Sequence, residues 1–525
     1  MMKFSLFTLA TLLLATAEAG QVTFNVISPG ATTVQVKVNG KTTSLEAPYN
    51  NVPFYTGKVD VGSETSYRYI ADDKAEEFTR QLTSGKEETY NEFFGRPVTY
   101  AQLPKLPRPL DNGKQWRRDD KNVDLFDSNY IPSIFVNGQS RDIPKMIRNV
   151  SKKKFPVDLT FIGKDWVKTF HNVTWGISGA GKSQNPAKQS WRWQLSPGDT
   201  FQARTQFKIR NMEEDPTQIR EKLYADILHA MGTYANRANM VRYYINGEGY
   251  GTFNLLDDVK DYSYISAMFY NGHPPAEMGP LFDGSTGASF ECLNDPYDYG
   301  SWKPAKGSPQ GSDAIHQITT ALQQLHVEDA SAIQRFQRMF DVDQFLRFMV
   351  VEYLTADWDG YWQMQTNDGA YRDDAHNGTW YYIGQDFDGT FGVNLAVDVL
   401  NWSYKDYPKK FPRAVMINKL LENPDITHTF ETYLKDTVQQ LFNNHTLGPY
   451  ITAYHDFIAP DLQWDRSIQQ RSPGINYGWT FDQTYDNLFE EVVAPNKNGG
   501  GAAYGLTEWI DKKSKVAAKD LHFSL

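Results

Sequence analysis

Apolar and polar residues alternate along the first part of the chain with the two-residue period that is typical of β-strands. Between residues 20 and 95, short alternating runs are separated by turn sequences such as Asn39-Gly40. The runs are Val22-Phe24-Val26, Val34-Val36-Val38, Val59-Val61 and Tyr67-Tyr69. About six short strands of this kind predict a small β-sandwich over this segment.

The longer remainder of the chain mixes strand and helix patterns, which predicts an α+β fold. The strand-like runs FPVDLTFIG, FHNVTWGIS and TQFKIRN come first, and residues 241–256 predict a hairpin around Asn246-Gly247. Helices are predicted over residues 215–231, 312–325, 330–340, 343–355 and 506–521. A strand-rich lobe followed by a helical lobe is the order found in protein kinases, so we expect a bilobal, kinase-like domain.

The first twenty residues have the pattern of a secretory signal. A lysine, an apolar run and the small-x-small sequence Ala17-Glu18-Ala19 predict cleavage after Ala19. No later segment reaches the ~20 apolar residues that a membrane-spanning helix needs, so we expect a secreted protein without a transmembrane anchor. The predicted organisation is a signal peptide (1–19), a β-sandwich (20–95), a linker or extension (96–148) and a kinase-like domain (149–525).

Composition narrows the possible partners. The net charge of −10 argues against nucleic acid. Cys292 is the sole cysteine, so an internal disulfide is excluded and stability must come from a large core, which 40% hydrophobic residues can supply. Glycosylation sequons agree with a secretory route and begin at Asn149, Asn172, Asn377, Asn401 and Asn444.

The stretch between residues 355 and 392 carries the most informative chemistry. Its polar side chains lie in two acidic turns and between them: Asp357, Asp359, Asn367, Asp386 and Asp388. Phosphoryl transfer needs one Asp to receive the proton of the attacking hydroxyl, and an Asn and another Asp to hold Mg²⁺. The alternative is that Asp-Gly and Asn-Asp-Gly sequences only form hairpin turns. The second turn adjoins an aromatic strand at residues 380–383, where unpaired carboxylates are costly to desolvate. With this cost included, a phosphoryl-transfer site and simple hairpin turns are equally favoured.

A Walker A pattern occupies residues 176–183, but we reject a P-loop NTPase. Gln184-Asn185-Pro186 and the strand-like Trp191-Arg192-Trp193 follow where a P-loop requires a helix. A Gly-rich turn between two strands can still cover a triphosphate, with a lysine on its phosphates. The candidates are Gly179 and Gly181 in the turn, Lys188 as the first choice of lysine and Lys182 as the second. A flexible hairpin tip with a solvated lysine remains an equal alternative.

These segments resemble the spore-coat-protein-H (CotH) kinase family, in particular its secreted members from mucoralean moulds. The matching segments are GISGAGKSQNPAKQSWRWQL, DPTQIREKLYADIL, NGEGYG, the triplet 357–359 with Asn367 and Tyr371, and residues 386–392. Asp357 replaces the Asn usual in the family, and the Gly-rich turn lacks the arginine-glycine pair of bacterial members. The resemblance covers the chain from about residue 150 onward.

The resemblance implies an atypical protein kinase that uses ATP and Mg²⁺ (or Mn²⁺) to phosphorylate Ser or Thr in coat or secretory proteins. Residue by residue, it implies a catalytic base (Asp359), a main metal ligand (Asp386), lesser metal ligands (Asn367 and Asp388), a phosphate-binding lysine (Lys188) and a helical partner for that lysine (Glu221).

The resemblance also implies a second kind of function, because the fungal members are invasins that bind a host chaperone receptor. The predicted loop 369–378 resembles a region that distinguishes them, with Gly369, Tyr371, Arg372 and Asp373 as candidate receptor contacts. The alternative is therefore an adhesin at the cell wall or spore surface, on a kinase fold with weak or no activity.

A further interpretation concerns the N-terminal sandwich. Tyr49, Phe54 and Tyr55 are aromatic residues that can form a stacking platform for cell-wall polysaccharide. The alternative, which the local sequence favours, is an edge loop that packs on the sandwich.

Overall fold

A computed structural model describes residues 20–62, 65–110, 124–139, 141–179, 187–395, 397–496 and 501–525. They form two compact units, one of the described residues up to Thr99 together with Lys164–Trp166, and one of Tyr100–Gly163 and Val167–Leu525. Helices and several sheets occur together, so the chain is of the predicted α+β class. The predicted signal peptide, residues 1–19, lies outside the described residues.

Two sheets that share one apolar core form the N-terminal unit. In one sheet β1 pairs with antiparallel β4 and parallel β8, and the other has the order β3-β2-β5-β6 with β7 also paired to β5. Phe24, Val36 and Tyr69 are fully buried in this core, which has the packing of the predicted sandwich. The strands are β1 (Gln21–Ile27), β2 (Val34–Val38), β3 (Lys41–Ser44), β4 (Phe54–Asp60), β5 (Ser66–Ala71), β6 (Lys74–Ala75), β7 (Arg80–Gln81) and β8 (Glu88–Phe93).

The predicted stacking platform on this unit is wrong. Phe54 and Tyr55, both in β4, are only 5% and 8% exposed, and the side chain of Tyr55 belongs to the core of the unit. The hydroxyl of Tyr55 donates to the carbonyl oxygen of Ala31 at 2.6 Å. Tyr49, at 38% exposure, is the one member of the trio that faces solvent.

A closed barrel begins the second unit, with the strand order β10-β11-β12-β13-β15-β14-β9. The indole rings of Trp175 and Trp191 stack inside it at 4.8 Å, and Trp175 Nε1 donates to the Tyr243 hydroxyl at 2.7 Å. The strands are β9 (Ser133–Asn137), β10 (Phe155–Ile162), β11 (Val167–Ile177), β12 (Trp191–Gln194), β13 (Gln206–Arg210), β14 (Ala238–Ile245) and β15 (Glu248–Leu256). β9 and α1 (Ile143–Asn149) fall in the segment for which the sequence predicts a linker or extension.

The predicted hairpin around Asn246-Gly247 is confirmed. Both residues take left-handed conformations, with φ of 49° and 80°, between β14 and β15. This is the backbone of a tight turn that Asn-Gly favours.

The helix predicted over residues 215–231 begins later, since α2 spans Arg220–Ala230. Gln218 has a φ of 56°, which interrupts the helix before that point. The carboxylate of Asp215 accepts from the backbone N–H groups of Thr217, Ile219 and Arg220, so it still supplies acceptors to the first turn.

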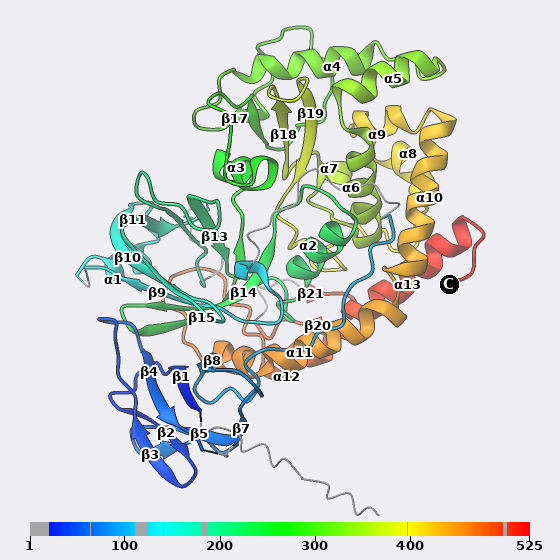
Figure 1. The fold of residues 1–525 in the computed structure, drawn as a ribbon. Coiled ribbons are helices and arrows are strands. Elements are labelled where there is room, and N and C mark those ends of the chain that lie inside the picture. The colour runs from blue at the N-terminus through cyan, green and yellow to red at the C-terminus, as the bar shows by residue number, and fades with distance from the viewer. Residues whose placement is uncertain are drawn as a thin grey trace, which may run out of the picture. The chain divides into compact units, whose positions relative to one another are not determined.

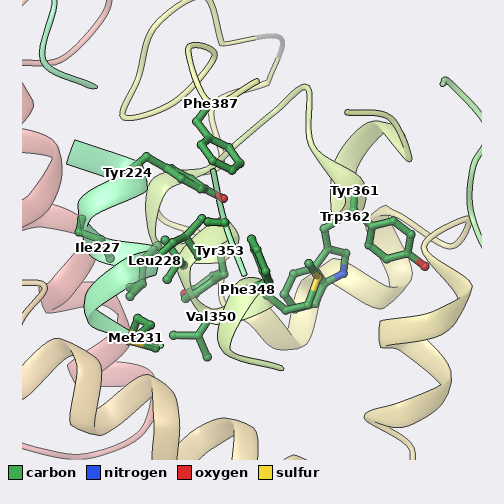
Figure 2. Packing of buried hydrophobic residues seen from close by; sticks show 14 of the residues in the cluster. Tyr224, Ile227, Leu228, Met231, Phe348, Val350, Tyr353, Tyr361, Trp362 and Phe387 are labelled. Atoms are coloured by element: carbon green, nitrogen blue, oxygen red, sulfur yellow. The ribbon is translucent and has the colours of Figure 1, made fainter. Parts of the chain in front are cut away.

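Helix α6 (Val342–Thr355) is the core helix of the second unit, as predicted. Every residue of α6 except Asp343 is buried, and the helix packs against α2, α10, α13 and β19. Figure 2 shows Phe348 and Tyr353 of α6 in the same cluster as Tyr224 and Phe387. The rings of Tyr224 and Phe387 stack at 4.2 Å, which fixes α2 to the segment after β19.

Another sheet of the second unit has the strand order β17-β16-β18-β19; β16 and β17 precede α6 in the chain, and β18 and β19 follow it (Figure 1). Its strands are β16 (Leu281–Gly284), β17 (Trp302–Pro304), β18 (Asp368–Asp373) and β19 (Thr379–Gly384). The predicted aromatic strand at residues 380–383 is confirmed as β19. The predicted loop 369–378 is wrong for residues 369–373, because these pair with β16 and β19 as part of β18.

The other predicted helices are confirmed within a few residues of their predicted ends: α4 (Ile315–Gln323), α5 (Ala330–Met339) and α13 (Leu506–Asp520). The remaining elements are α3 (Tyr262–Tyr270), α7 (Tyr361–Met364), α8 (Tyr407–Lys410), α9 (Val415–Leu420), α10 (Pro424–Gln440), α11 (Asn444–Arg466), α12 (Phe481–Asp486), β20 (Val492–Val493), β21 (Gly501–Ala502) and short 3₁₀ turns at Asp124–Phe126, Ser312–Ala314 and Tyr404–Asp406. In the described part of the chain, none of the helices combines the length and apolar character needed to cross a membrane.

Candidate active site

The two acidic turns lie side by side at the base of the β18–β19 hairpin. The backbone N–H of Trp358, in the turn after α6, donates to the carbonyl oxygen of Gly389 at 3.3 Å. The N–H of Gln385, after β19, donates to the carbonyl oxygen of Asn367 at 3.0 Å. These bonds bring together three segments that the sequence singles out separately.

Asp359 is held in place by Asn367. Asn367 Nδ2 donates to the backbone oxygen of Asp359 and to its Oδ2, both at 2.9 Å. Partial burial and then the neighbouring Asp388 raise the pKa of Asp359. A carboxylate with a fixed orientation and a raised pKa is suited to accept a proton from a substrate hydroxyl.

Arg210, at the end of β13, lies between the two aspartates of the second turn. Its guanidinium contacts the carboxylates of Asp386 and Asp388, and its Nε lies 3.3 Å from Glu221 Oε1 on α2. Burial raises the pKa of Glu221, whereas the charge of Arg210 opposes that shift. One guanidinium therefore joins carboxylates from two different elements.

A cavity of about 510 Å³ opens beside this cluster. Residues of the Gly-rich turn, the barrel and the second acidic turn line it, among them Gly179, Lys208, Arg210, Asp386 and Asp388. Burial in the cleft, followed by the charge of Arg210, lowers the pKa of Lys208 to about 8. Strand β13 thus supplies two cations to the cavity and the turn after β19 supplies two carboxylates, while Glu214, Asp258 and Asp283 add further carboxylates to its lining.

Sequence reasoning missed Lys208 and Arg210, although the run TQFKIRN contains a signal for them. Phe207 and Ile209 are fully buried inside the barrel, so the residues that alternate with them must face the other way. The pattern therefore places Lys208 and Arg210 together on the outward face of the strand, where they can bind an anionic ligand.

Lys188 does not line the cavity. Its Nζ lies 2.5 Å from Asp465 Oδ1 on α11 and donates to the carbonyl oxygen of Thr252 at 2.7 Å, and the residue is 3% exposed. Glu221, expected as its partner, contacts Arg210 and accepts a hydrogen bond from Asn254 Nδ2 at 3.0 Å. Gly179 lines the cavity, whereas Gly181 and Lys182 lie outside the described residues.

Asp357, which replaces the family's Asn, is buried with Glu352. A Cβ on Gly360 would lie 3.0 Å from the carboxyl carbons of both side chains, so the two carboxyl groups are close neighbours. Burial and then Glu352 raise the pKa of Asp357 far above its usual value, and burial raises the pKa of Glu352 to about 8. These shifts favour the protonated forms, and a protonated Asp resembles Asn in charge and size.

No group of three or more His, Cys, Asp or Glu side chains in the described part of the chain is arranged to hold a metal by itself. Mg²⁺ usually takes one or two carboxylates and completes its shell with phosphate oxygens and water. Asp386 and Asp388 carry two carboxylates, which a metal ion would share with the guanidinium of Arg210, and Asn367 offers an amide oxygen because its nitrogen is used by Asp359. This donor set fits an ion that arrives with a nucleotide.

The predicted receptor contacts lie mostly inside the fold. Gly369, Tyr371 and Asp373 are buried, and the Tyr270 hydroxyl lies 2.6 Å from Asp373 Oδ1. Arg372 is partly buried and its Nε lies 2.5 Å from Asp374 Oδ1. The exposed part of the hairpin is residues 374–377.

All five sequon asparagines have exposed side chains, which attachment of a glycan requires. They are Asn149, Asn172, Asn377, Asn401 and Asn444.

The family model described as CotH kinase protein matches residues 176–497, which include both acidic turns and β13. The chain belongs to the CotH kinase protein family. It is 53% identical over 523 residues to Invasin CotH3 of Rhizopus delemar, covering 98% of this chain and 87% of that protein. It is 52% identical over 524 residues to Spore coat protein homolog 1 of the same organism, covering 99% and 85%.

The chain is also similar to a bacterial protein. Inner spore coat protein H of Bacillus subtilis is 21% identical over 355 residues, which cover 65% of this chain and 84% of that protein. The resemblance to CotH proteins, and to their fungal invasin members, is thereby confirmed.

The Lys188–Asp465 pair predicts a stability effect. Asp465 Oδ2 also lies 3.2 Å from Arg466 Nη1, so replacing Lys188 with Met removes one of two cations that contact this buried carboxylate. We expect a loss of up to about 3–5 kcal/mol in the free energy of unfolding. Asp465→Asn should also destabilise, and the double variant should cost less than the sum of the single changes. Denaturant unfolding of the four proteins measures this coupling, and a fully stable Lys188→Met protein would contradict the assignment.

Proposed function

We propose that this chain is a secreted or cell-surface atypical protein kinase of bilobal fold, which transfers the γ-phosphate of ATP to Ser or Thr of coat or secretory proteins. The observation that carries the proposal is the grouping of Asp359, Asn367, Asp386 and Asp388, of which the last two line a cavity together with Lys208. Membership of the CotH kinase protein family supports it. The predicted secretory signal and the exposed sequons support the location.

The residues have distinct roles in this reaction. The substrate hydroxyl oxygen bonds to the γ-phosphorus, the bond from that phosphorus to the β,γ-bridging oxygen breaks, and the hydroxyl proton passes to Asp359. Bound Mg²⁺ or Mn²⁺ supplies positive charge to the phosphate oxygens, and Asp386, Asp388 and the Asn367 oxygen would hold it. Lys208 takes the phosphate-binding role in place of Lys188, since Lys208 lines the cavity.

Substitutions in the two acidic turns should separate binding from transfer. Asp386→Asn removes a metal ligand, so Mg²⁺-dependent ATP binding should be lost in calorimetry. Asp359→Asn removes the proton acceptor, so ATP should still bind while transfer to protein falls by at least about 100-fold.

Asp425→Asn, at the exposed start of α10, serves as a control that should change neither quantity. Transfer at the wild-type rate in Asp359→Asn would remove this residue as the base. Metal-dependent binding retained in Asp386→Asn would remove it as the ligand.

The role of Lys208 predicts a pH dependence. Its pKa of about 8 means that the free protein loses this positive charge as the pH rises through that value. Phosphate binding favours the charged form of Lys208, and Glu214 in the same cavity, whose pKa is raised by burial to about 7, gains negative charge as the pH rises. Nucleotide affinity should therefore fall between about pH 7 and pH 9. Lys208→Arg stays charged over this range and should flatten the profile, whereas Lys260→Arg, at the cavity rim, should not. Identical profiles for wild type and Lys208→Arg would exclude Lys208 from the phosphate site.

A second candidate function is adhesion, because relatives at 52–53% identity are named invasins. We propose residues 374–377, the exposed turn of the β18–β19 hairpin, as the contact for a host surface chaperone receptor. Replacing these residues with Gly and Ser should abolish binding of the purified chain to host cells and to the receptor. Asp359→Asn should bind as the wild type does. Cell binding that survives the loop exchange would remove this turn from the adhesion surface.

A further inference from the structure

A second cavity, of about 600 Å³, lies between the segment that follows the second acidic turn and the start of α13. Its side chains fall into two classes. Carboxylates come from Asp398, Glu490, Glu491 and Glu508. Apolar and aromatic surface comes from Leu395, Phe489 and Tyr504.

The cavity carries an excess of negative charge. The Tyr504 hydroxyl donates to Asp398 Oδ2 at 2.8 Å, and Glu508 Oε1 is paired with Lys512 Nζ at 2.6 Å. Glu490 and Glu491 are exposed and form no ion pair with any described residue. A cationic group that enters the cavity would therefore find carboxylates not already neutralised, and an acidic group would be repelled.

Phe489 gives the cavity an apolar side. It is 46% exposed, with its ring 5.3 Å from that of Tyr485. Arginine and lysine combine a charged head with an apolar stem, so they match a site in which aromatic surface adjoins carboxylates. The complementary partner is thus a polypeptide segment with a basic residue beside an apolar one.

Hydrogen bonds connect this cavity to the candidate active site. Trp358, next to the proposed base, donates from Nε1 to the carbonyl oxygen of Val393 at 3.1 Å. Asn394, the next residue, bonds to two other segments. Its backbone N–H donates to the carbonyl oxygen of Gly501 at 3.1 Å, and its Nδ2 donates to Glu214 Oε2 at 2.8 Å. Glu214 lines the first cavity, and the segment 393–395 leads directly into the second.

We infer that the second cavity docks the polypeptide substrate, and that it selects segments in which Arg or Lys and an apolar residue lie near the acceptor hydroxyl. That the docked polypeptide is a substrate rests on the proposed kinase function. The binding itself rests only on the charge and shape of the cavity.

Fluorescence anisotropy on the purified full chain, without nucleotide, tests the inference. The probe is a fluorescein-labelled peptide with two arginines and a leucine around one serine, and its control has glutamates in place of the arginines. The basic peptide should bind and the acidic one should not. Glu490→Lys with Glu491→Lys should weaken binding of the basic peptide by about tenfold or more, and added salt should weaken it in the wild type.

Two matched variants sharpen the result. Phe489→Ala should also weaken binding, because the apolar side is lost, whereas Glu328→Lys, exposed and outside the cavity, should leave affinity unchanged. Equal binding of both peptides, or wild-type affinity in the Glu490→Lys/Glu491→Lys protein, would overturn the inference.

A parallel titration with ATP and Mg²⁺ keeps this proposal separate from the kinase proposal. The Glu490→Lys/Glu491→Lys protein should bind nucleotide as the wild type does, because these residues line only the second cavity. If the wild type binds the basic peptide but no nucleotide, docking stands and the kinase proposal fails. If it binds nucleotide but not the peptide, the docking inference fails and the kinase proposal stands.

Discussion

The guanidinium of Arg210 keeps acidic side chains together that would otherwise repel one another. It contacts Asp386 and Asp388 after β19, and its Nε lies 3.3 Å from Glu221 Oε1 on α2. Partly buried carboxylates are costly unless a cation pairs with them, so the acidic turn depends on a residue from the barrel. The barrel, α2 and the turn after β19 are thus fixed around the cavity by one cluster of charges.

The same balance of burial and charge explains how the turn after α6 accommodates Asp357. Four acidic side chains, at positions 352, 357, 359 and 388, influence one another there. Because burial raises the pKa of Asp357 and of Glu352, the local negative charge is smaller than the sequence suggests. The proposed base, Asp359, is only partly buried and keeps contact with the amide of Asn367. Of Glu352, Asp357 and Asp359, the proposed base Asp359 is therefore the side chain that combines partial exposure with a fixed orientation.

Local patterns predicted the elements better than they predicted the partners of individual side chains. The helix at α6, the hairpin at Asn246-Gly247 and the order of the acidic turns follow from periodicity and turn chemistry, which act over a few residues. The surroundings of Lys188 do not, because its carboxylate partner is 277 residues away. Alternation along TQFKIRN places Lys208 on the face opposite the buried Phe207 and Ile209, but that this face borders a cavity depends on closure of the barrel and on the distant turn after β19. The loop prediction at residues 369–373 failed because these residues pair with the neighbouring β19 and, for residues 369–371, also with β16 from a distant part of the chain.

Buried ion pairs between the barrel and α11 also constrain when the barrel can be completed. Lys188 pairs with Asp465, and Arg242 with Asp461, across separations of 277 and 219 residues. During synthesis the barrel strands emerge long before α11, so Lys188 and Arg242 lack these two aspartates until most of the chain has been made. Contacts this distant in sequence slow folding, since a long loop must close before they form. The barrel and the cavity beside it therefore reach their final form only after α11 has been made.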